Sequence, residues 1–192
     1  MAKLLPTPMI QGEKVWLRAM EKRDLETFLR MSNDLEIGFA AGYFFPQSMT
    51  ALEKWYDELM GNQHGKDGFY FTICLIDSDD PVGFAWLHQL DHNNCNAEFS
   101  ICLSDTELMG KGLGTDALNA VLDFGFGNLP LERIYLLVGH DNNRAIRSYE
   151  KAGMVLEGVR RKAFRFQGKM VDDLLMSMLR EEWEALERRK MD

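Results

Sequence analysis

The sequence predicts a mixed α/β fold made as one domain. Its 192 residues are the length of one ordinary domain, and a hydrophobic content of 46% is enough for a sizeable core. Runs of strand-forming residues alternate along the chain with amphipathic segments of helical period. The predicted order is β-α-α-β-β-β-α-β-α-β-β, with about seven strands in a mostly antiparallel mixed sheet and about four helices. No internal repeat or linker interrupts this order, so we expect residues 1–192 to form a single domain.

The first elements are a strand and two helices. The strand is predicted over residues 14–20, and an acidic, cap-rich start leads from it into a helix over 21–31. Ser48 can cap a second helix over 48–60, which has apolar residues at helical spacing on one face. The aromatic-rich segment 38–46 shows no period. We expect it to be a loop pinned to the core, and a substrate-lining loop is the alternative.

The middle of the chain predicts an antiparallel meander. Strand-like runs cover residues 69–77 and 82–90, and the turn sequence between them is typical of a hairpin. A polar turn at 91–94 leads into a third run at 96–103. Three strands in succession therefore form one antiparallel unit.

The second half alternates helices and strands before a final hairpin. Its predicted elements are a helix over 112–126, a strand over 133–138, a helix over 142–151, strands over 154–166 and 170–179, and a charged tail at 180–190 that can extend as a helix.

Composition excludes several classes of function. The formal charge of −8 argues against a general nucleic-acid or membrane-surface binder. No window has the apolar length of a membrane span, and the first residues do not resemble an export signal, so we expect a cytoplasmic protein. The three cysteines and four histidines show no metal-ligand spacing, which predicts neither a metal site nor a disulfide framework. Cys74 and Cys102 are interpreted as small buried residues on strands.

The most informative segment is the glycine-rich stretch Met109–Thr115, which ends where a strong helix begins. Glycines leave the backbone bare, so several N–H groups can converge on an anion beside the helix N-terminus. Lys111 can add a charge and Thr115 a hydroxyl donor. A tight turn into a buried helix is the plainer interpretation, but one glycine would serve that purpose and here there are three. The pattern favours a phosphate-binding loop.

Two other nucleotide-binding patterns fit this loop less well. A P-loop needs a lysine directly before Thr115, and Gly114 stands there instead. The segment 112–117 formally fits the dinucleotide pattern GxGxxA, but six residues, 104–109, separate the preceding strand from the first glycine of the loop, and the strands before it are antiparallel. An NAD- or flavin-dependent oxidoreductase is therefore the less favoured alternative.

The loop resembles the acetyl-CoA signature [Q/R]xxGx[G/A] of the GCN5-related N-acetyltransferases (GNAT), with Gly112 and Gly114 at the two small positions. The segment 142–154 resembles the asparagine-helix-tyrosine motif of the same family. The opening residues 16–25 are similar to the branch that contains ribosomal-protein N-acetyltransferases and spermidine acetyltransferases, so the resemblance covers nearly the whole chain. It implies the GNAT fold, whose sheet is splayed where the cofactor binds.

The resemblance also implies the residues that bind acetyl-CoA, the acetyl donor. The strand ending at Leu103 would pair with the pantetheine arm, the glycine loop would hold the pyrophosphate, and Asn142 would orient the arm. Met109 departs from the family's Gln or Arg at the head of the loop, and Met154 from its usual Phe. The implied cofactor residues, all within 96–154, are Ile101, Leu103, Met109, Gly110, Lys111, Gly112, Leu113, Gly114, Thr115, Asn142, Arg144 and Ala145.

Two residues are implied in catalysis. Tyr149 stands where the family places the acid that protonates the coenzyme A thiolate, although a tyrosine packed on the sheet would look the same in sequence. Glu98 resembles the family's glutamate on the strand beside the cleft, where it would act as the base, directly or through water. Strand alternation places Glu98, Ser100 and Cys102 on one face. A cation-binding group and a solvated strand residue are the alternatives for Glu98.

The resemblance predicts an acetyl-CoA-dependent N-acetyltransferase that transfers the acetyl group directly to a primary amine in a ternary complex. A non-catalytic acetyl-CoA-binding regulator is the alternative with the same fold. Eight basic and two acidic residues between 144 and 170 leave the rest of the chain strongly acidic, which favours a cationic acceptor such as a polyamine, an aminoglycoside or a peptide N-terminus. Pairing into a homo-oligomer through the last strands or the tail is left open.

Overall fold

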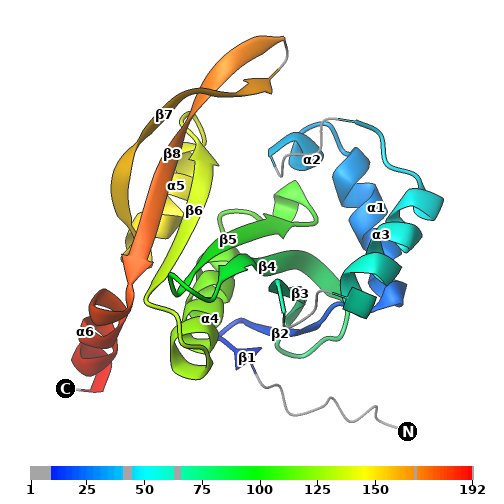
Figure 1. Ribbon diagram of the computed structural model, residues 1–192. Helices are drawn as coiled ribbons and strands as arrows, with labels where there is room; N and C mark the ends of the chain where they lie inside the picture. The colour runs from blue at the N-terminus through cyan, green and yellow to red at the C-terminus, as the bar shows by residue number, and fades with distance from the viewer. Residues whose placement is uncertain (1–9, 41–44, 63–65, 167, 192) are drawn as a thin grey trace, which may run out of the picture.

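A computed structural model describes residues 10–40, 45–62, 66–166 and 168–191. In this part of the chain, eight strands form one sheet in the order β1-β2-β3-β4-β5-β6-β8-β7 (Figure 1). The strands are β1 (Ile10–Gln11), β2 (Val15–Ala19), β3 (Gly68–Leu75), β4 (Pro81–Asp91), β5 (Asn96–Leu103), β6 (Arg133–Gly139), β7 (Val155–Phe166) and β8 (Lys169–Leu179). The helices are α1 (Leu25–Asn33), α2 (Ile37–Ala40), α3 (Met49–Asn62), α4 (Leu113–Asn128), α5 (Asn143–Lys151) and α6 (Arg180–Met191), with short 3-10 turns η1 (Lys22–Asp24) and η2 (Thr106–Leu108).

The predicted mixed fold and element order are confirmed, with two additions. β1 is an eighth strand of two residues, too short to show any alternation in sequence. The helix α2 lies at Ile37–Ala40, where the sequence predicted the start of a loop over 38–46. Residues 41–44 of that segment lie outside the described part of the chain. The predicted charged tail forms α6, whose Trp183 ring stacks on Phe126 of α4.

The sheet has a single parallel junction, between β5 and β6, among its described strand pairs. This junction contains three residue pairs, and Glu98 opposite Tyr135 is the last of them. Beyond this pair β5 and β6 diverge, and β6 continues in register with β8 as far as Gly139. β7 and β8 extend past the rest of the sheet as a long hairpin (Figure 1). The sheet is thus divided into two blocks that meet at one short seam.

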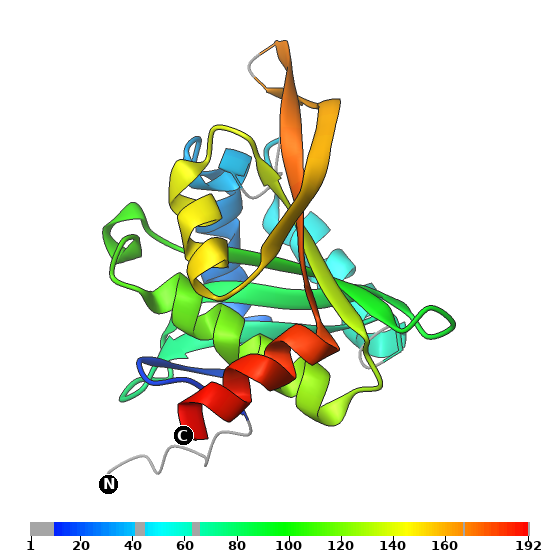
Figure 2. The same cartoon turned by 90° about the vertical axis from the view of Figure 1, so that its left-hand side faces the viewer.

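Two hydrophobic cores lie on the two faces of the sheet. The larger core packs α4 against the sheet and includes Phe99, Leu118 and Phe126. The smaller core packs α1 and α3 against the other face, with Phe28 in edge contact with both Phe84 and Trp86. The figures show α4 and α1 on opposite sides of the strands (Figures 1 and 2). In the smaller core, the apolar side chains that helical spacing places on one face of α1 therefore pack against those that strand alternation places on one face of β4.

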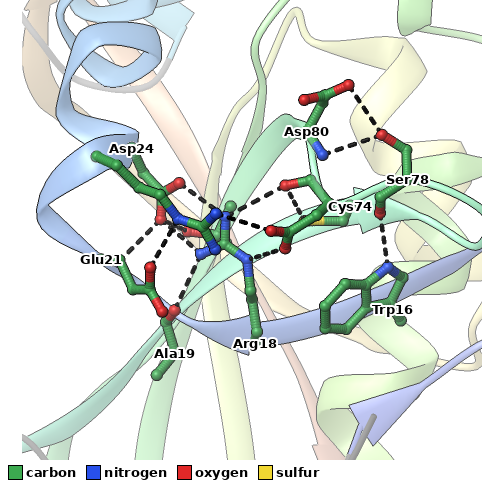
Figure 3. Close-up of polar contacts among 11 residues, drawn as sticks. Trp16, Arg18, Ala19, Glu21, Asp24, Cys74, Ser78 and Asp80 are labelled. Carbon is green, nitrogen blue, oxygen red and sulfur yellow. Dashed lines mark hydrogen bonds and ion pairs between the residues drawn. The ribbon is translucent and has the colours of Figure 1, made fainter. Parts of the chain in front are cut away.

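A buried polar network joins β2 to the start of α1 (Figure 3). Asp24 is almost fully buried, and its carboxylate accepts two hydrogen bonds from the Arg18 guanidinium at 2.7 and 2.8 Å. The hydroxyl of Thr72 and the backbone N–H of Glu21 donate to the same carboxylate. Arg18 also donates to Asp79, in the turn between β3 and β4. The network fixes where α1 leaves the sheet, and α1 carries residues of the site described below.

This network predicts a loss of stability in acid. Hydrogen bonds and the Arg18 charge hold the pKa of both Asp24 and Asp79 below the usual carboxyl range, although burial opposes the shift. A depressed pKa stabilises the folded state above the unfolded value of about 4 and stops doing so as the pH falls through the folded value. Urea unfolding at a series of pH values measures the free energy of unfolding. The contribution of these two carboxylates to it should be nearly constant above pH 5 and should fall below about pH 4. In Asp24→Asn the free energy of unfolding should change less steeply with pH below pH 4 than in the wild type. An unchanged slope would contradict this account.

No helix in the described ranges is both long and apolar enough to cross a membrane.

Candidate active site

A cavity of about 1760 Å³ opens where β5 and β6 diverge. Its walls come from both diverging strands, the α1–α2 segment, the loop before α4, α5 and the β7–β8 hairpin. Residues 99–103 of β5 and residues 137–139 of β6 are among its lining residues. β4 pairs with only one edge of β5, so the other edge of β5 faces this cavity beyond Glu98. The predicted splayed sheet is present.

The glycine loop adopts backbone conformations with positive φ, which residues that carry a side chain rarely adopt. Gly110 has φ +75° and Gly112 has φ +84°, and Gly112 is the N-cap of α4. A Cβ added at Gly110 or Gly114 would meet no atom within 4 Å, so open space lies beside the bare backbone. The N–H groups of the first turn of α4 begin at this same point, where the helix dipole favours an anion. The loop therefore fits a pyrophosphate group.

The turn between β1 and β2 is fastened to this loop. The carboxylate of Asp116, in the first turn of α4, accepts hydrogen bonds from three successive backbone N–H groups, those of Glu13, Lys14 and Val15, at 2.8 to 2.9 Å. A Cβ at Gly12 would overlap the same carboxylate, so a side chain there would displace Asp116. The Lys14 ammonium donates to the Lys111 carbonyl at 3.0 Å. An ammonium group thus stands at the loop although Met109 has replaced the family's Gln or Arg.

The second predicted motif forms α5 and faces the loop. The side chain of Asn142 caps this helix by accepting from the Ala145 N–H. The hydroxyls of Thr115 and Ser148 are hydrogen-bonded, which joins α4 to α5. Asn142 therefore positions the start of α5 at the cavity wall.

Tyr149 lies on α5, lines the cavity and packs against the larger core. Burial raises the pKa of its phenol, and the nearby Cys102 thiol raises it further. Burial also raises the pKa of Cys102 to about 12. Both groups are therefore protonated at neutral pH, so Tyr149 has a proton to give and Cys102 is not a thiolate nucleophile.

Glu98 lies at the seam of the sheet. Its carboxylate accepts a hydrogen bond from the Gln89 amide at 2.9 Å and interacts with the hydroxyl of Tyr135, its partner across the strands. Gln89 has φ +51° at a β-bulge, which turns its side chain toward Glu98. Burial raises the pKa of Glu98 despite the hydrogen bond from Tyr135. The Glu98 side chain does not line the cavity, so it can reach an acceptor only through an intervening group.

The cavity brings together most of the cofactor residues that the resemblance implied: Ile101, Leu103, Met109, Gly110, Lys111, Gly112, Gly114, Thr115, Asn142, Arg144 and Ala145. Leu113 is not among them, because its side chain is buried in the larger core. Ser100, Trp86, Glu36 and Asp173 also line the cavity and were not predicted as site residues. The positions of Trp86, Ser100 and Asp173 depend on which strands are neighbours, that of Glu36 depends on how the α1–α2 segment packs, and no local pattern marks any of them.

In the described ranges, no group of three or more His, Cys, Asp and Glu side chains is placed to hold a metal ion.

The split sheet, the glycine loop on a helix N-terminus and the tyrosine-bearing helix together define a GNAT N-acetyltransferase. Residues 14–155 match the family model described as the acetyltransferase (GNAT) domain, and the chain belongs to this family. It is an enzyme that uses acetyl-CoA as acetyl donor for an amine, which confirms the predicted family, activity and cofactor.

Among known proteins the chain is similar to the spermidine N(1)-acetyltransferases of Escherichia coli K12 (28% identity, 92% of each chain) and Vibrio cholerae (30% identity, 90% of this chain and 96% of the relative). It is also similar to a putative ribosomal N-acetyltransferase of Bacillus subtilis (26% identity, 91% and 96%). A crystal structure of the Vibrio cholerae spermidine N-acetyltransferase in complex with CoA and spermine aligns with a TM-score of 0.80 at 28% identity, over 88% of this chain and 98% of that chain.

Proposed function

We propose that the acceptor is a primary amine of a small polycation of the polyamine class. The observation that carries this proposal is the separation of charge along the cavity. Four carboxylates, from the α1–α2 segment and the η2 turn, border one part of it with one basic side chain: Asp34, Glu36, Asp105, Glu107 and Arg30. The lining from the glycine loop and α5, with the turn before α5, has four basic side chains and one carboxylate: Lys111, Arg144, Arg147, Lys151 and Asp141.

This separation matches the charges of the two substrates. The basic part suits the phosphates of acetyl-CoA, and the acidic part suits an acceptor with several ammonium groups. The relatives named above support the same acceptor, since two of them are spermidine acetyltransferases that align over about nine-tenths of both chains.

We propose that the cofactor residues act as follows. Acetyl-CoA supplies an acetyl thioester when bound. The loop around Gly112 and the N-terminus of α4 hold its pyrophosphate, Lys111 adds charge, and the free edge of β5 at Ile101 and Leu103 offers backbone groups to the pantetheine arm. Tyr149 gives its phenolic proton to the departing thiolate, which suits a group that burial keeps protonated.

The experiment that tests the acceptor is amine-dependent thiol release from acetyl-CoA, measured across spermidine, spermine, aminoglycosides and N-terminal peptides. We expect the highest kcat/KM with spermidine or spermine. A preference for an N-terminal peptide would reject the polyamine proposal and favour a protein acceptor instead.

Replacing Glu36 by glutamine should raise KM for spermidine about fivefold and leave kcat within about twofold, because an exposed ion pair contributes up to about 1 kcal/mol. The effect should shrink at 0.5 M salt, where exposed charges are screened. Steady-state kinetics at low salt and at 0.5 M salt measure the change in KM and its dependence on salt. Glu26→Gln is the matched control, since Glu26 is also exposed, lies on α1 and does not line the cavity. An equal change in both variants would remove Glu36 from acceptor binding.

Glu98 is proposed as the carboxylate that supports removal of the acceptor proton, as the resemblance implies. Its position at the seam and its raised pKa support this role. Glu98→Gln should lower kcat/KM about tenfold and move the acidic limb of the pH profile to lower pH. The limb moves because the removed carboxylate no longer raises the pKa of the group that takes the acceptor proton. A wild-type pH profile in this variant would contradict the role.

A further inference from the structure

A histidine and a serine form a hydrogen-bonded pair at the cavity wall, next to Glu98. The distance between His88 Nε2 on β4 and Ser100 Oγ on β5 is 2.9 Å. Ser100 lines the cavity, whereas His88 lies behind it and is only partly exposed. The geometry points to a proton path: Ser100 receives the proton of the acceptor amine while passing its own to His88. This inference rests on the proposed amine acetylation and names the group through which the proton leaves.

The register of the sheet creates the pair. His88 lies directly opposite Glu98, and Trp86 lies directly opposite Ser100, so all four side chains share one face of the sheet, and Trp86 and Ser100 also line the cavity. His88 and Ser100 are diagonal neighbours on this face, and a histidine side chain is long enough to reach across. The hydroxyl is therefore held between the imidazole and the cavity. Glu98 does not line the cavity, and its carboxylate accepts hydrogen bonds from Gln89 and Tyr135 instead.

The titratable groups that border His88 come from both neighbouring strands. Glu98 on β5 is the strand partner of His88 on one side. On the other side its partner is Gly68 of β3. Asp67 precedes Gly68, and the Tyr70 hydroxyl lies close to Gly68. Burial lowers the pKa of His88, so the imidazole is neutral and able to accept a proton above about pH 6.5. The Glu98 carboxylate opposite then stands beside the imidazolium that forms.

The protons balance. As the nitrogen attacks the carbonyl carbon, its N–H bond breaks and its proton moves to Ser100 Oγ, while the Ser100 O–H proton moves to His88 Nε2. The C–S bond breaks and its sulfur takes the Tyr149 proton. His88 has gained one proton and Tyr149 has lost one, and exchange with solvent restores both.

The test measures kcat/KM against pH for Ser100→Ala, His88→Gln and the double variant, with whichever amine the acceptor panel identifies. Each single variant should lose about 100-fold in kcat with KM for acetyl-CoA within twofold, and the acidic limb should disappear in His88→Gln. The double variant should be no slower than the slower single variant, because both residues serve one path. His92→Gln is the control: His92 lies in the β4–β5 turn, contacts the Lys66 carbonyl and should not change the profile.

Two kinetic results would overturn the inference. One is a wild-type pH profile in both single variants. The other is a pair of losses that multiply in the double variant, which would indicate two independent structural defects.

A nuclear magnetic resonance titration of the His88 ring in the CoA-bound protein gives an answer that does not depend on the acceptor. We expect a neutral ring at pH 7.5 with Nε2 unprotonated, and a changed Nε2 shift in Ser100→Ala. A ring that carries its proton on Nε2 would overturn the inference even with an active enzyme. If no amine is acetylated, the proposed function fails, while this titration still decides the His88–Ser100 pair.

Discussion

Tyr149→Phe is expected to lower kcat for acetyl transfer about 100-fold while Kd for acetyl-CoA stays within about twofold. The substitution keeps the ring, which packs against the core, and removes the proton that the thiolate would receive. The high pKa of the phenol means that the wild-type enzyme should keep this acid through pH 9, so its profile should show no basic limb from Tyr149 below that pH. Single-turnover thiol release and calorimetric binding measure the two quantities separately.

Tyr56→Phe is the matched control for this experiment. Tyr56 lies on α3, and its hydroxyl donates to the Met20 carbonyl outside the cavity. It should therefore change stability slightly and kcat not at all. A wild-type single-turnover rate in Tyr149→Phe would remove Tyr149 from catalysis.

Asp24→Ala is expected to lower the free energy of unfolding by about 3 to 5 kcal/mol. It would leave the Arg18 guanidinium without its bidentate partner and the Thr72 hydroxyl without its acceptor, both in a buried setting. Urea unfolding at pH 7 measures the change.

The control is Asp57→Ala, because the exposed Lys22–Asp57 pair, at 3.3 Å, should contribute little. A loss below about 1 kcal/mol in Asp24→Ala would mean that the network contributes little to stability. The experiment also bears on function, since Asp24 is the N-cap of α1, and α1 leads to the carboxylates at Asp34 and Glu36.

Sequence periodicity was sufficient to predict the order of most elements. The predicted strand over 96–103 coincides with β5, and the helix predicted over 142–151 is α5 with Asn142 as its cap. Both segments carry strong local signals, alternation in one and a capping residue in the other. β1 and α2 have two and four residues, and no periodic signal can develop over so short a length.

The site divides in the same way. Its cofactor half could be predicted because the glycine loop and the Asn142 helix are each continuous in sequence. The acceptor half could not, because its groups meet across strands. The contact of His88 with Ser100 spans twelve residues. In the cofactor half, the contact of Asp116 with the turn at Lys14 spans about a hundred and was not predicted either. Such contacts follow from strand register and from the order of the sheet, which local patterns do not contain.

Because the junction between β5 and β6 is short, bound coenzyme A would also contribute to the stability of the folded protein. Among the described strands, none covers the edge of β5 beyond Glu98, and a bound pantetheine arm would pair with this edge as a further strand would. A ligand that binds only the folded state at 100 times its Kd adds about 2.7 kcal/mol to stability. The lifetime of the enzyme against proteolysis should then rise and fall with the supply of coenzyme A, so that abundance and donor supply are linked without any dedicated regulatory site.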